Sequence, residues 1–243
     1  MPDDIASRLT PPARELPDTD WYVDRLYGFA ERMGASIISA TYSRYVVDLN
    51  RSPQSESLYA NNPTSPVCAT RTFSGEPVYQ AGMGPGDTEI ADRVEKYWHP
   101  YHQCIAEELW RIRSEHGYAL LWDAHSIASR VPALFDGELP QFNFGTRDGA
   151  SCPDSATQAL LATALAGGSD SAVANGRFNG GYITMAYGRP DDRVWAVQLE
   201  LAQRAYMQES PRGEWDPARA GETAGRIEQL LRQYLSLGRA QHA

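Results

Sequence analysis

Two apolar runs, each followed by polar side chains, constrain most strongly what this chain can fold into. The first run, Tyr118–Trp122 (YALLW), comes directly after a helical pattern that ends at Gly117, and the second, Val194–Leu199 (VWAVQL), ends at Glu200. Short continuous apolar runs are typical of strands buried on both faces, as in parallel sheets. Open α/β sheets bind their ligands beyond the carboxyl ends of such strands. We therefore expect a functional site where these two runs end.

The rest of the chain alternates between helical and strand patterns without repeats or a linker. The apolar spacing predicts helices over residues 20–33, 87–116, 155–166 and 218–238, and strands over residues 35–41, 45–49, 118–122, 171–174 and 194–199. This order predicts one α/β domain spanning residues 1–243, with a central mixed, mostly parallel sheet flanked by helices.

Local signals set the expected boundaries of these elements. Asp18 or Thr19 is the expected N-cap of the first helix and Gly34 its end, and Pro100 is expected to kink or split the second helix. Residues 52–86 and 127–154 are rich in turn-forming residue types and are expected to be loops. The first of these loops is long enough to serve as a lid or rim.

Charge and cysteine content narrow the classes of function. Acidic residues outnumber basic ones by 31 to 22, for a formal net charge of −9. Phosphate contacts need a basic surface, so this balance disfavours a nucleic-acid partner. We expect neither a membrane span nor an export signal. The three scattered cysteines fit a reducing cytoplasm. We therefore expect a cytoplasmic protein with a small-molecule partner, either a monomer or a homodimer.

His125 and Glu200 are the first candidate site residues. A lone His beside an apolar strand is most often a core or capping residue, but Asp123 lies on the same face of an extended chain and could orient the ring. Glu200 closes an apolar strand, where an ionised carboxylate needs a partner or a cleft. A salt bridge with Arg204 is the simple alternative. One imidazole and one carboxylate at two strand ends indicate a metal hydrolase with Glu200 as the general base.

Residues 44–51 (RYVVDLNR) contain the third group of candidates. Asn50 and Arg51 follow a predicted strand, and a guanidinium beside an amide can grip a carboxylate through two hydrogen bonds. The alternative for Arg51 is a surface ion pair. Asp20 and Asp24 share a helix face, which also describes a capped, solvated helix start.

Other polar residues have both a functional and a structural interpretation. Asn175 and the segment 180–182 (GGY) form a glycine-bearing loop that lets backbone approach a ligand, or an ordinary turn. His99 and His102 have a spacing that can bind metal. With no third ligand nearby, we interpret His99 as a surface residue and keep His102 as a second candidate.

From Asp18 to Met207 the chain resembles the N-formylglutamate amidohydrolase (N-formylglutamate deformylase) family. The matching stretches are residues 16–21 (LPDTDW), 42–44 (YSR), 48–51 (DLNR), 122–126 (WDAHS), 148–152 (DGASC), 180–184 (GGYIT) and 198–200 (QLE). The resemblance implies a mixed sheet flanked by helices, similar to zinc carboxypeptidases and acyl-amino-acid deacylases. It also implies hydrolysis of N-formyl-L-glutamate to formate and L-glutamate in histidine degradation.

The same resemblance implies roles for single residues. His125 would be a Zn²⁺ ligand, Asp20 a carboxylate ligand of the metal and Glu200 the general acid/base. Asn50 and Arg51 resemble the pair that binds the substrate carboxylate in the carboxypeptidases. The remaining candidates for substrate binding are Arg44, Arg71, Asn175, Gly181 and Tyr182. Zinc held by three protein ligands lowers the pKa of bound water to roughly 7, which a formamide needs for attack.

The chain departs from the family pattern at several positions. Family members open with a strand ending in Pro-His-x-Gly, whose His is a first zinc ligand, whereas this chain begins at Met1. We expect the domain to lack that strand, through a misplaced translation start or as a truncated, metal-poor form. Met185 and Ala186 replace an expected Arg and His, and Asn179 replaces a common Lys. These changes leave open a related N-acyl amino acid as substrate.

Two hypotheses from different classes follow. The first is a zinc amidohydrolase that cleaves N-formylglutamate. The second is a metal-poor or inactive homologue that binds an acidic metabolite.

Overall fold

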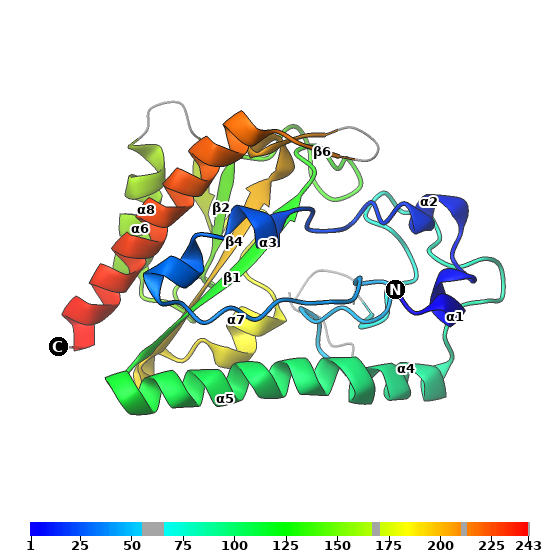
Figure 1. Ribbon diagram of the computed structural model, residues 1–243, viewed down its shortest axis with the longest axis horizontal. Coiled ribbons are helices and arrows are strands. Elements are labelled where there is room, and N and C mark those ends of the chain that lie inside the picture. Colours follow the sequence, from blue (N-terminus) through cyan, green and yellow to red (C-terminus); the bar gives the residue numbers. More distant parts are fainter. Residues whose placement is uncertain (55–65, 167–170, 210–212, 243) are drawn as a thin grey trace.

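A computed structural model of the protein describes residues 1–54, 66–166, 171–209 and 213–242. Its centre is a four-stranded sheet in the order β1-β4-β2-β3 (Figure 1). The strands are β1 (Ala119–Ile127), β2 (Phe142–Gly145), β3 (Ala172–Ala174) and β4 (Val194–Ala202). β1 pairs with β4 and β2 with β3 in parallel, while β2 and β4 are antiparallel. The expectation of a mixed, mostly parallel sheet in a single domain is confirmed.

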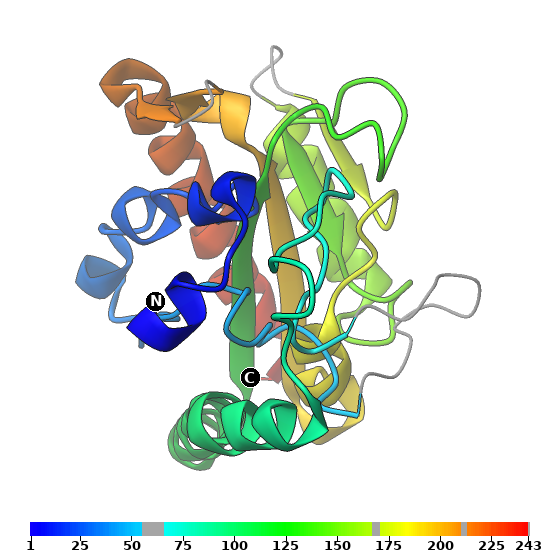
Figure 2. The same cartoon turned by 90° about the vertical axis from the view of Figure 1, so that its right-hand side faces the viewer.

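Helices lie on both sides of this sheet (Figures 1 and 2). One face packs against α6 (Asp154–Leu165) and α8 (Pro217–His242), which also contact each other. On the other side, α5 (His99–His116) contacts β1 and α7 (Tyr182–Tyr187) contacts β4. The shorter elements are α1 (Asp3–Ala6), α2 (Pro11–Arg14), α3 (Val23–Leu26), η1 (Ala30–Met33), α4 (Asp87–Arg93), η2 (Val94–Trp98), η3 (Pro190–Asp192), η4 (Gln203–Ala205), β5 (Met207–Gln208) and β6 (Glu214–Trp215).

The sequence of β4 is almost continuously apolar because all nine of its residues are buried. Side chains along a strand alternate between the two faces of a sheet. Trp195, Val197, Leu199 and Leu201 belong to the main core, together with residues of α6 and α8. The intervening positions therefore point to the opposite face, and two of them are the polar residues 198 and 200.

The first predicted helix, 20–33, is wrong in its extent. The structure has only α3 and the 3-10 turn η1 in this range. Gly28 separates them and disfavours a continuous helix. Gly34, at φ 78°, ends η1 as expected. Asp18 does not cap a helix, because its carboxylate accepts hydrogen bonds from the Tyr45 hydroxyl and the Phe73 N–H.

The second predicted helix, 87–116, is present as α4, a π-helical segment (η2) and α5. Pro100 lies in the first turn of α5, where its missing N–H is tolerated. The expected disruption therefore takes the form of a π segment just before the proline. Gly117, at φ 79°, ends α5 as expected.

Two predicted strands are absent. Residues 35–41 are irregular and largely exposed, and residues 45–49 form turns. Tyr45, Val46 and Val47 are nevertheless buried, in two small clusters of loop and helix residues. Burial of loop side chains thus produced an apolar pattern that resembled a strand.

Other boundaries also shifted. β1 runs to Ile127 and β4 to Ala202, so Asp123, His125 and Glu200 lie within strands rather than after them. The predicted loop 127–154 contains β2, which was missed because it is only four residues long. α7 has no counterpart among the predicted elements. The predicted elements 155–166, 171–174 and 218–238 correspond to α6, β3 and α8.

The predicted loop 52–86 is only partly described, because residues 55–65 lie outside the described residues. Its described part forms isolated bridges, Leu9 with Tyr79 and Arg71 with Pro77. In the part of the chain that the structure describes, no helix has both the length and the apolar character to cross a membrane.

The contact between β2 and the loop before α7 generates a prediction. A Cβ atom added at Gly145 would lie 2.5 Å from the backbone nitrogen of Gly180. We expect Gly145→Ala to lower the free energy of unfolding by about 1–3 kcal/mol, because backbone cannot yield as a side chain does. Urea denaturation measures this. Gly221→Ala on α8, where a Cβ meets nothing within 4 Å, should instead add about 0.5–1 kcal/mol. Equal effects of the two substitutions would contradict the prediction.

Candidate active site

The parallel pairing of β1 with β4 places His125 directly beside Glu200. Paired residues of neighbouring strands point to the same face of a sheet. Asp123 and Gln198 form an earlier pair of the same register and share this face. The face is opposite to the core against α6 and α8. Residues 125 and 200 therefore lie on one side of the sheet, as a site shared by these two strands requires.

The imidazole of His125 lies between two carboxylates. Nε2 is 3.0 Å from Asp123 Oδ1, and Nδ1 is 3.5 Å from Asp20 Oδ2. The side-chain nitrogen of Asn50 is also 3.0 Å from Nε2. Burial alone would lower the pKa of His125, but the charges of Asp123 and Asp20 outweigh it and raise this pKa well above its ordinary value. The interpretation of His125 as an ordinary core residue does not describe this environment.

Asp20 reaches the site from the segment that precedes α3. Its Oδ1 accepts a hydrogen bond from the backbone N–H of Ser126 at 2.6 Å, which holds the carboxylate at the end of β1. Its side chain remains 44% exposed, so Oδ2 is accessible beside His125. Asp24 is exposed, and the solvated-helix interpretation applies to it alone.

Glu200 is a buried carboxyl group. Burial raises its pKa from 4.5 to about 8; His125 opposes this shift and Asp20 reinforces it. Burial thus favours the neutral, protonated form of Glu200. The alternative of an ion pair with Arg204 is wrong, because the Arg204 Nε lies 2.9 Å from Glu138.

Asn50 connects the site to the loop before α7. Its Nδ2 donates to Asp123 Oδ2 at 3.2 Å, and its Oδ1 accepts from the Ile183 N–H at 2.8 Å. The guanidinium of Arg51 donates to the Asn50 carbonyl at 2.9 Å. The Asn50 side chain thus lies in the site, whereas the contact of Arg51 is with the Asn50 backbone, and their role as carboxylate binders stays a prediction.

Arg44 is engaged within the protein. It forms an ion pair with Asp48, and its guanidinium stacks on Phe73 with 4.1 Å to the ring centroid. Burial alone would raise the pKa of Asp48, but Arg44 and Arg51 hold it below its ordinary value. Much of the positive charge of Arg44 is therefore balanced by Asp48 before any substrate binds.

The three glycine-loop candidates have different surroundings. Asn175, at φ 51°, accepts a hydrogen bond from the Thr146 N–H at 2.8 Å, which fits an ordinary turn. The Gly181 N–H donates to the side chain of Gln198 at 2.7 Å. The ring of Tyr182 packs edge-on against Trp98.

His102 and His99 lie outside this cluster. His102 Nε2 contacts the Leu49 carbonyl oxygen at 2.8 Å and Nδ1 contacts the Tyr187 hydroxyl at 2.9 Å. Burial lowers the pKa of His102 to about 4. His102 is thus a neutral core histidine with both nitrogens engaged. His99 is half-exposed, as the surface interpretation expects.

The residues present offer a metal two donors. A tetrahedral zinc with ligands about 2.0–2.2 Å away sets its donor atoms roughly 3.3–3.5 Å apart. His125 Nδ1 and Asp20 Oδ2, at 3.5 Å, match that separation, and Asp123 on Nε2 matches the usual second partner of a ligating imidazole. Among the described residues, however, no group of three or more His, Cys, Asp or Glu could hold a metal ion.

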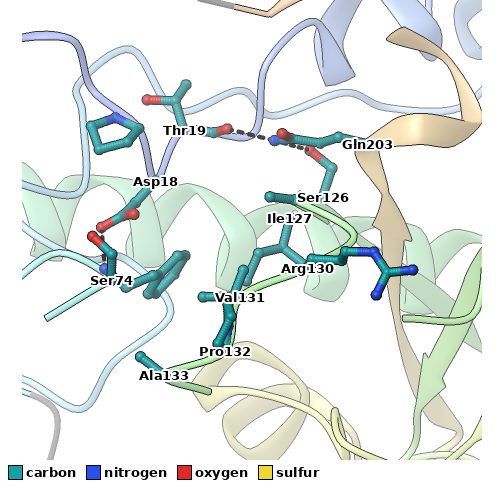
Figure 3. Close-up of a pocket in the computed structure, with 13 residues that line it drawn as sticks. Asp18, Thr19, Ser74, Ser126, Ile127, Arg130, Val131, Pro132, Ala133 and Gln203 are labelled. Atoms are coloured by element: carbon teal, nitrogen blue, oxygen red, sulfur yellow. Dashed lines mark hydrogen bonds between the residues drawn. The ribbon is translucent and has the colours of Figure 1, made fainter. Parts of the chain in front are cut away.

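A pocket of about 400 Å³ opens beside Ser126, the residue after His125 (Figure 3). Its walls include Asp18, Phe73 and Gln203. In Figure 3 the Arg130 side chain points away from Asp18 and Ser74. The pocket is of a size that admits a small molecule, but its lining does not include His125 or Glu200.

Two polar residues on the site face escaped the sequence analysis as single candidates. Gln198 contacts Glu200, and its position two residues earlier on an apolar strand could have revealed it. Asn143 of β2 is paired with Glu200 and donates to its backbone carbonyl. No sequence signal marked Asn143, because β2 itself was not predicted.

Tyr101 of α5 has a pKa raised to about 12, mainly by burial and also by Asp123.

Three positions at which the chain departs from the family pattern lie in the loop before α7 or on α7 itself. Asn179 is hydrogen-bonded to Asp148 through both its oxygen and its nitrogen. Met185 and Ala186 lie on α7, and Met185 is 38% exposed. None of these three side chains supplies a positive charge to the site.

The fold and the site together define a class of protein. A mixed α/β sheet that sets a histidine–carboxylate pair beside a buried carboxyl group has the groups of a hydrolytic enzyme. The family model described as N-formylglutamate amidohydrolase matches residues 1–207. The chain belongs to the N-formylglutamate amidohydrolase family, which is a family of amidohydrolase enzymes.

Similar proteins include two curated relatives. The N-formylglutamate deformylase of Pseudomonas aeruginosa is 48% identical over 239 residues, covering 98% of this chain and 90% of its own. The N-formylglutamate deformylase of Pseudomonas putida is 45% identical over 238 residues, covering 98% and 89%.

Two solved structures share the fold. An N-formylglutamate amidohydrolase from Ralstonia eutropha superposes with a TM-score of 0.77 at 22% identity, covering 98% of this chain and 89% of its own. A gene product of Agrobacterium tumefaciens has a TM-score of 0.66 at 17% identity, covering 90% and 79%.

The raised pKa of Glu200 generates a prediction about stability. Between its ordinary pKa of 4.5 and its folded value of about 8, the folded protein keeps a proton that the unfolded chain has lost. The free energy of unfolding should therefore fall as pH rises through this interval. Glutamine does not titrate, so the Glu200→Gln variant should not show this loss. The free energy of unfolding of the variant minus that of the unmodified protein should therefore be about 2–4 kcal/mol larger at pH ~8 than at pH ~5.

Urea denaturation at both pH values measures this difference. Glu222→Gln, an exposed change on α8, is the matched control and should show no such pH dependence. A stability difference for Glu200→Gln that is the same at both pH values would refute the prediction.

Proposed function

We propose that this protein hydrolyses the formamide C–N bond of N-formyl-L-glutamate to formate and L-glutamate. We propose further that the reaction depends on zinc and serves histidine degradation in the cytoplasm. The observation that carries the proposal is the in-register pair of His125 and Glu200. It is supported by the two relatives whose names state this activity.

Glu200 would be the group that moves the proton. A carboxyl group that is buried and whose pKa is raised to about 8 can hold a proton near neutral pH and release it within the working range. In amide hydrolysis its ionised form would take a proton from the attacking water, and the resulting carboxylic acid would deliver that proton to the departing amine nitrogen. General acid–base transfer of this kind typically contributes about 10²–10⁴-fold in rate.

His125 and Asp20 would hold the zinc ion, with Asp123 fixing the orientation of the imidazole. Zinc, when bound, supplies Lewis-acid chemistry that polarises a carbonyl group and acidifies water. Catalytic zinc sites usually have three protein ligands, and the described residues offer two.

Arg51 is our first choice for binding a substrate carboxylate. Its guanidinium donates a hydrogen bond to the backbone carbonyl of Asn50. Arg44 would act through the local positive field, because Asp48 already pairs with it. Gly181 and Tyr182 would line the same side of the site.

A related N-acyl amino acid is the second candidate substrate. The side chain of Asn179 is fully engaged with Asp148, and Met185 and Ala186 carry no charge. Nearby cations favour binding of a substrate with two carboxylates, and positions 179, 185 and 186 supply none. Comparing N-formyl derivatives of glutamate, glutamine and leucine distinguishes the two substrates.

The role of Glu200 generates a prediction about rate. We expect Glu200→Gln to lower kcat for formate release by about 10²–10⁴-fold with little change in KM, because the lost proton transfer matters in the transition state. Glu222→Gln on the exposed face of α8 serves as the control. Full activity of Glu200→Gln would remove Glu200 from the mechanism.

The zinc site generates a separate prediction. Elemental analysis of the purified protein should find zinc, and His125→Ala should lose it because one of the two described donors is gone. His99→Ala, a half-exposed histidine on α5, should retain the metal. Formate release should stop with excess chelator and return with added zinc. Zinc content that is unchanged in His125→Ala, or hydrolysis that continues in chelator, would rule out this site.

A further inference from the structure

Gln198 forms a buried bridge between the loop before α7 and Glu200. Its side-chain Oε1 accepts the Gly181 N–H at 2.7 Å, and its Nε2 donates to Glu200 Oε2 at 3.3 Å. Gln198 is only 5% exposed. A buried amide that satisfies one group at each end has little freedom to reorient.

The direction of the amide is determined by its partners. A backbone N–H can only donate, so the atom of Gln198 that meets Gly181 must be the oxygen. The NH₂ group is therefore the end that meets Glu200. This assignment follows from donor and acceptor chemistry and does not depend on distinguishing nitrogen from oxygen in coordinates.

Gly181 is itself fixed in place. A Cβ atom at this position would lie 2.3 Å from Asn50 Oδ1, so backbone and amide are in close contact. The same Oδ1 accepts the Ile183 N–H at 2.8 Å. Asn50 in turn contacts His125. A continuous set of contacts thus runs from His125 through Asn50, Gly181 and Gln198 to Glu200.

The backbone of Glu200 is held as well. Asn143 Nδ2 donates to the Glu200 carbonyl oxygen at 3.0 Å, and residues 143 and 200 are paired across β2 and β4. With the main chain fixed, the remaining freedom of Glu200 lies in its side-chain torsions. Gln198 is the described residue that donates a side-chain hydrogen bond to this carboxyl group.

We propose that Gln198 is a positioning residue that orients the carboxyl group of Glu200. Its NH₂ group donates to Oε2 and so restricts rotation of the carboxyl group about its last side-chain torsion. This inference rests on the proposed function, in which Glu200 transfers a proton.

The test separates the two ends of the bridge. Gln198→Glu keeps an acceptor for the Gly181 N–H but loses the donor to Glu200, whereas Gln198→Met keeps the length and loses both. We expect each variant to lower kcat for formate release from N-formylglutamate on the order of 10- to 100-fold with KM within about twofold, because a misoriented proton donor affects the transition state. Circular dichroism verifies folding.

Thr223→Val is the matched control, since it also removes a buried side-chain hydrogen bond, to the Ala205 carbonyl, on the opposite side of the sheet. It should leave kcat unchanged. Unchanged kcat in both Gln198 variants, or a loss carried entirely by KM, would overturn the inference.

A second measurement shows whether Gln198 acts through Glu200. In the Glu200→Gln background, adding Gln198→Met should cause no further loss of the residual rate, because the group it positions is already gone. An equal further loss in both backgrounds would mean that Gln198 is merely structural, and would overturn the inference. If the unmodified protein releases no formate, the proposed function itself fails, and this inference fails with it.

Discussion

The in-register pairing of β1 with β4 is the interaction on which the rest of the structure depends. It places His125 beside Glu200 and Asp123 beside Gln198, four polar side chains on one face of a sheet whose other face is core. A slip of one residue would reverse the facing of every side chain in the shifted strand. The apolar residues that pack against α6 and α8 therefore also hold the site in register.

The site is built from charges that are costly to bury. His125 is stabilised by Asp123 and Asp20, while burial raises the pKa of Glu200 and so favours its neutral form. Amide side chains satisfy much of what remains, chiefly Asn50 and Gln198. Such a network contributes most to stability when every member has a hydrogen-bond partner. Its members come from distant parts of the chain and contact one another around the loop before α7.

Sequence patterns predicted helices and strands correctly where local signals and tertiary burial agreed. The long helix through α4 and α5, the strand patterns of β1 and β4, and the C-terminal helix were predicted close to their positions. They failed where tertiary contacts decided, as at residues 45–49, whose apolar side chains are buried in turns. The short strand β2 had no periodicity to detect, so Asn143 was missed together with it.

The sequence by itself determined the residue types at the site and the faces they occupy, because strand alternation and the apolar runs are local properties of the chain. It indicated His125, Glu200, Asp20 and Asn50 as site residues. Only the tertiary structure decided that Asp123 contacts the imidazole, that Arg44 is paired with Asp48, and that Arg204 is not the partner of Glu200. These outcomes depend on distances between segments far apart in the sequence, which packing sets and local patterns do not encode.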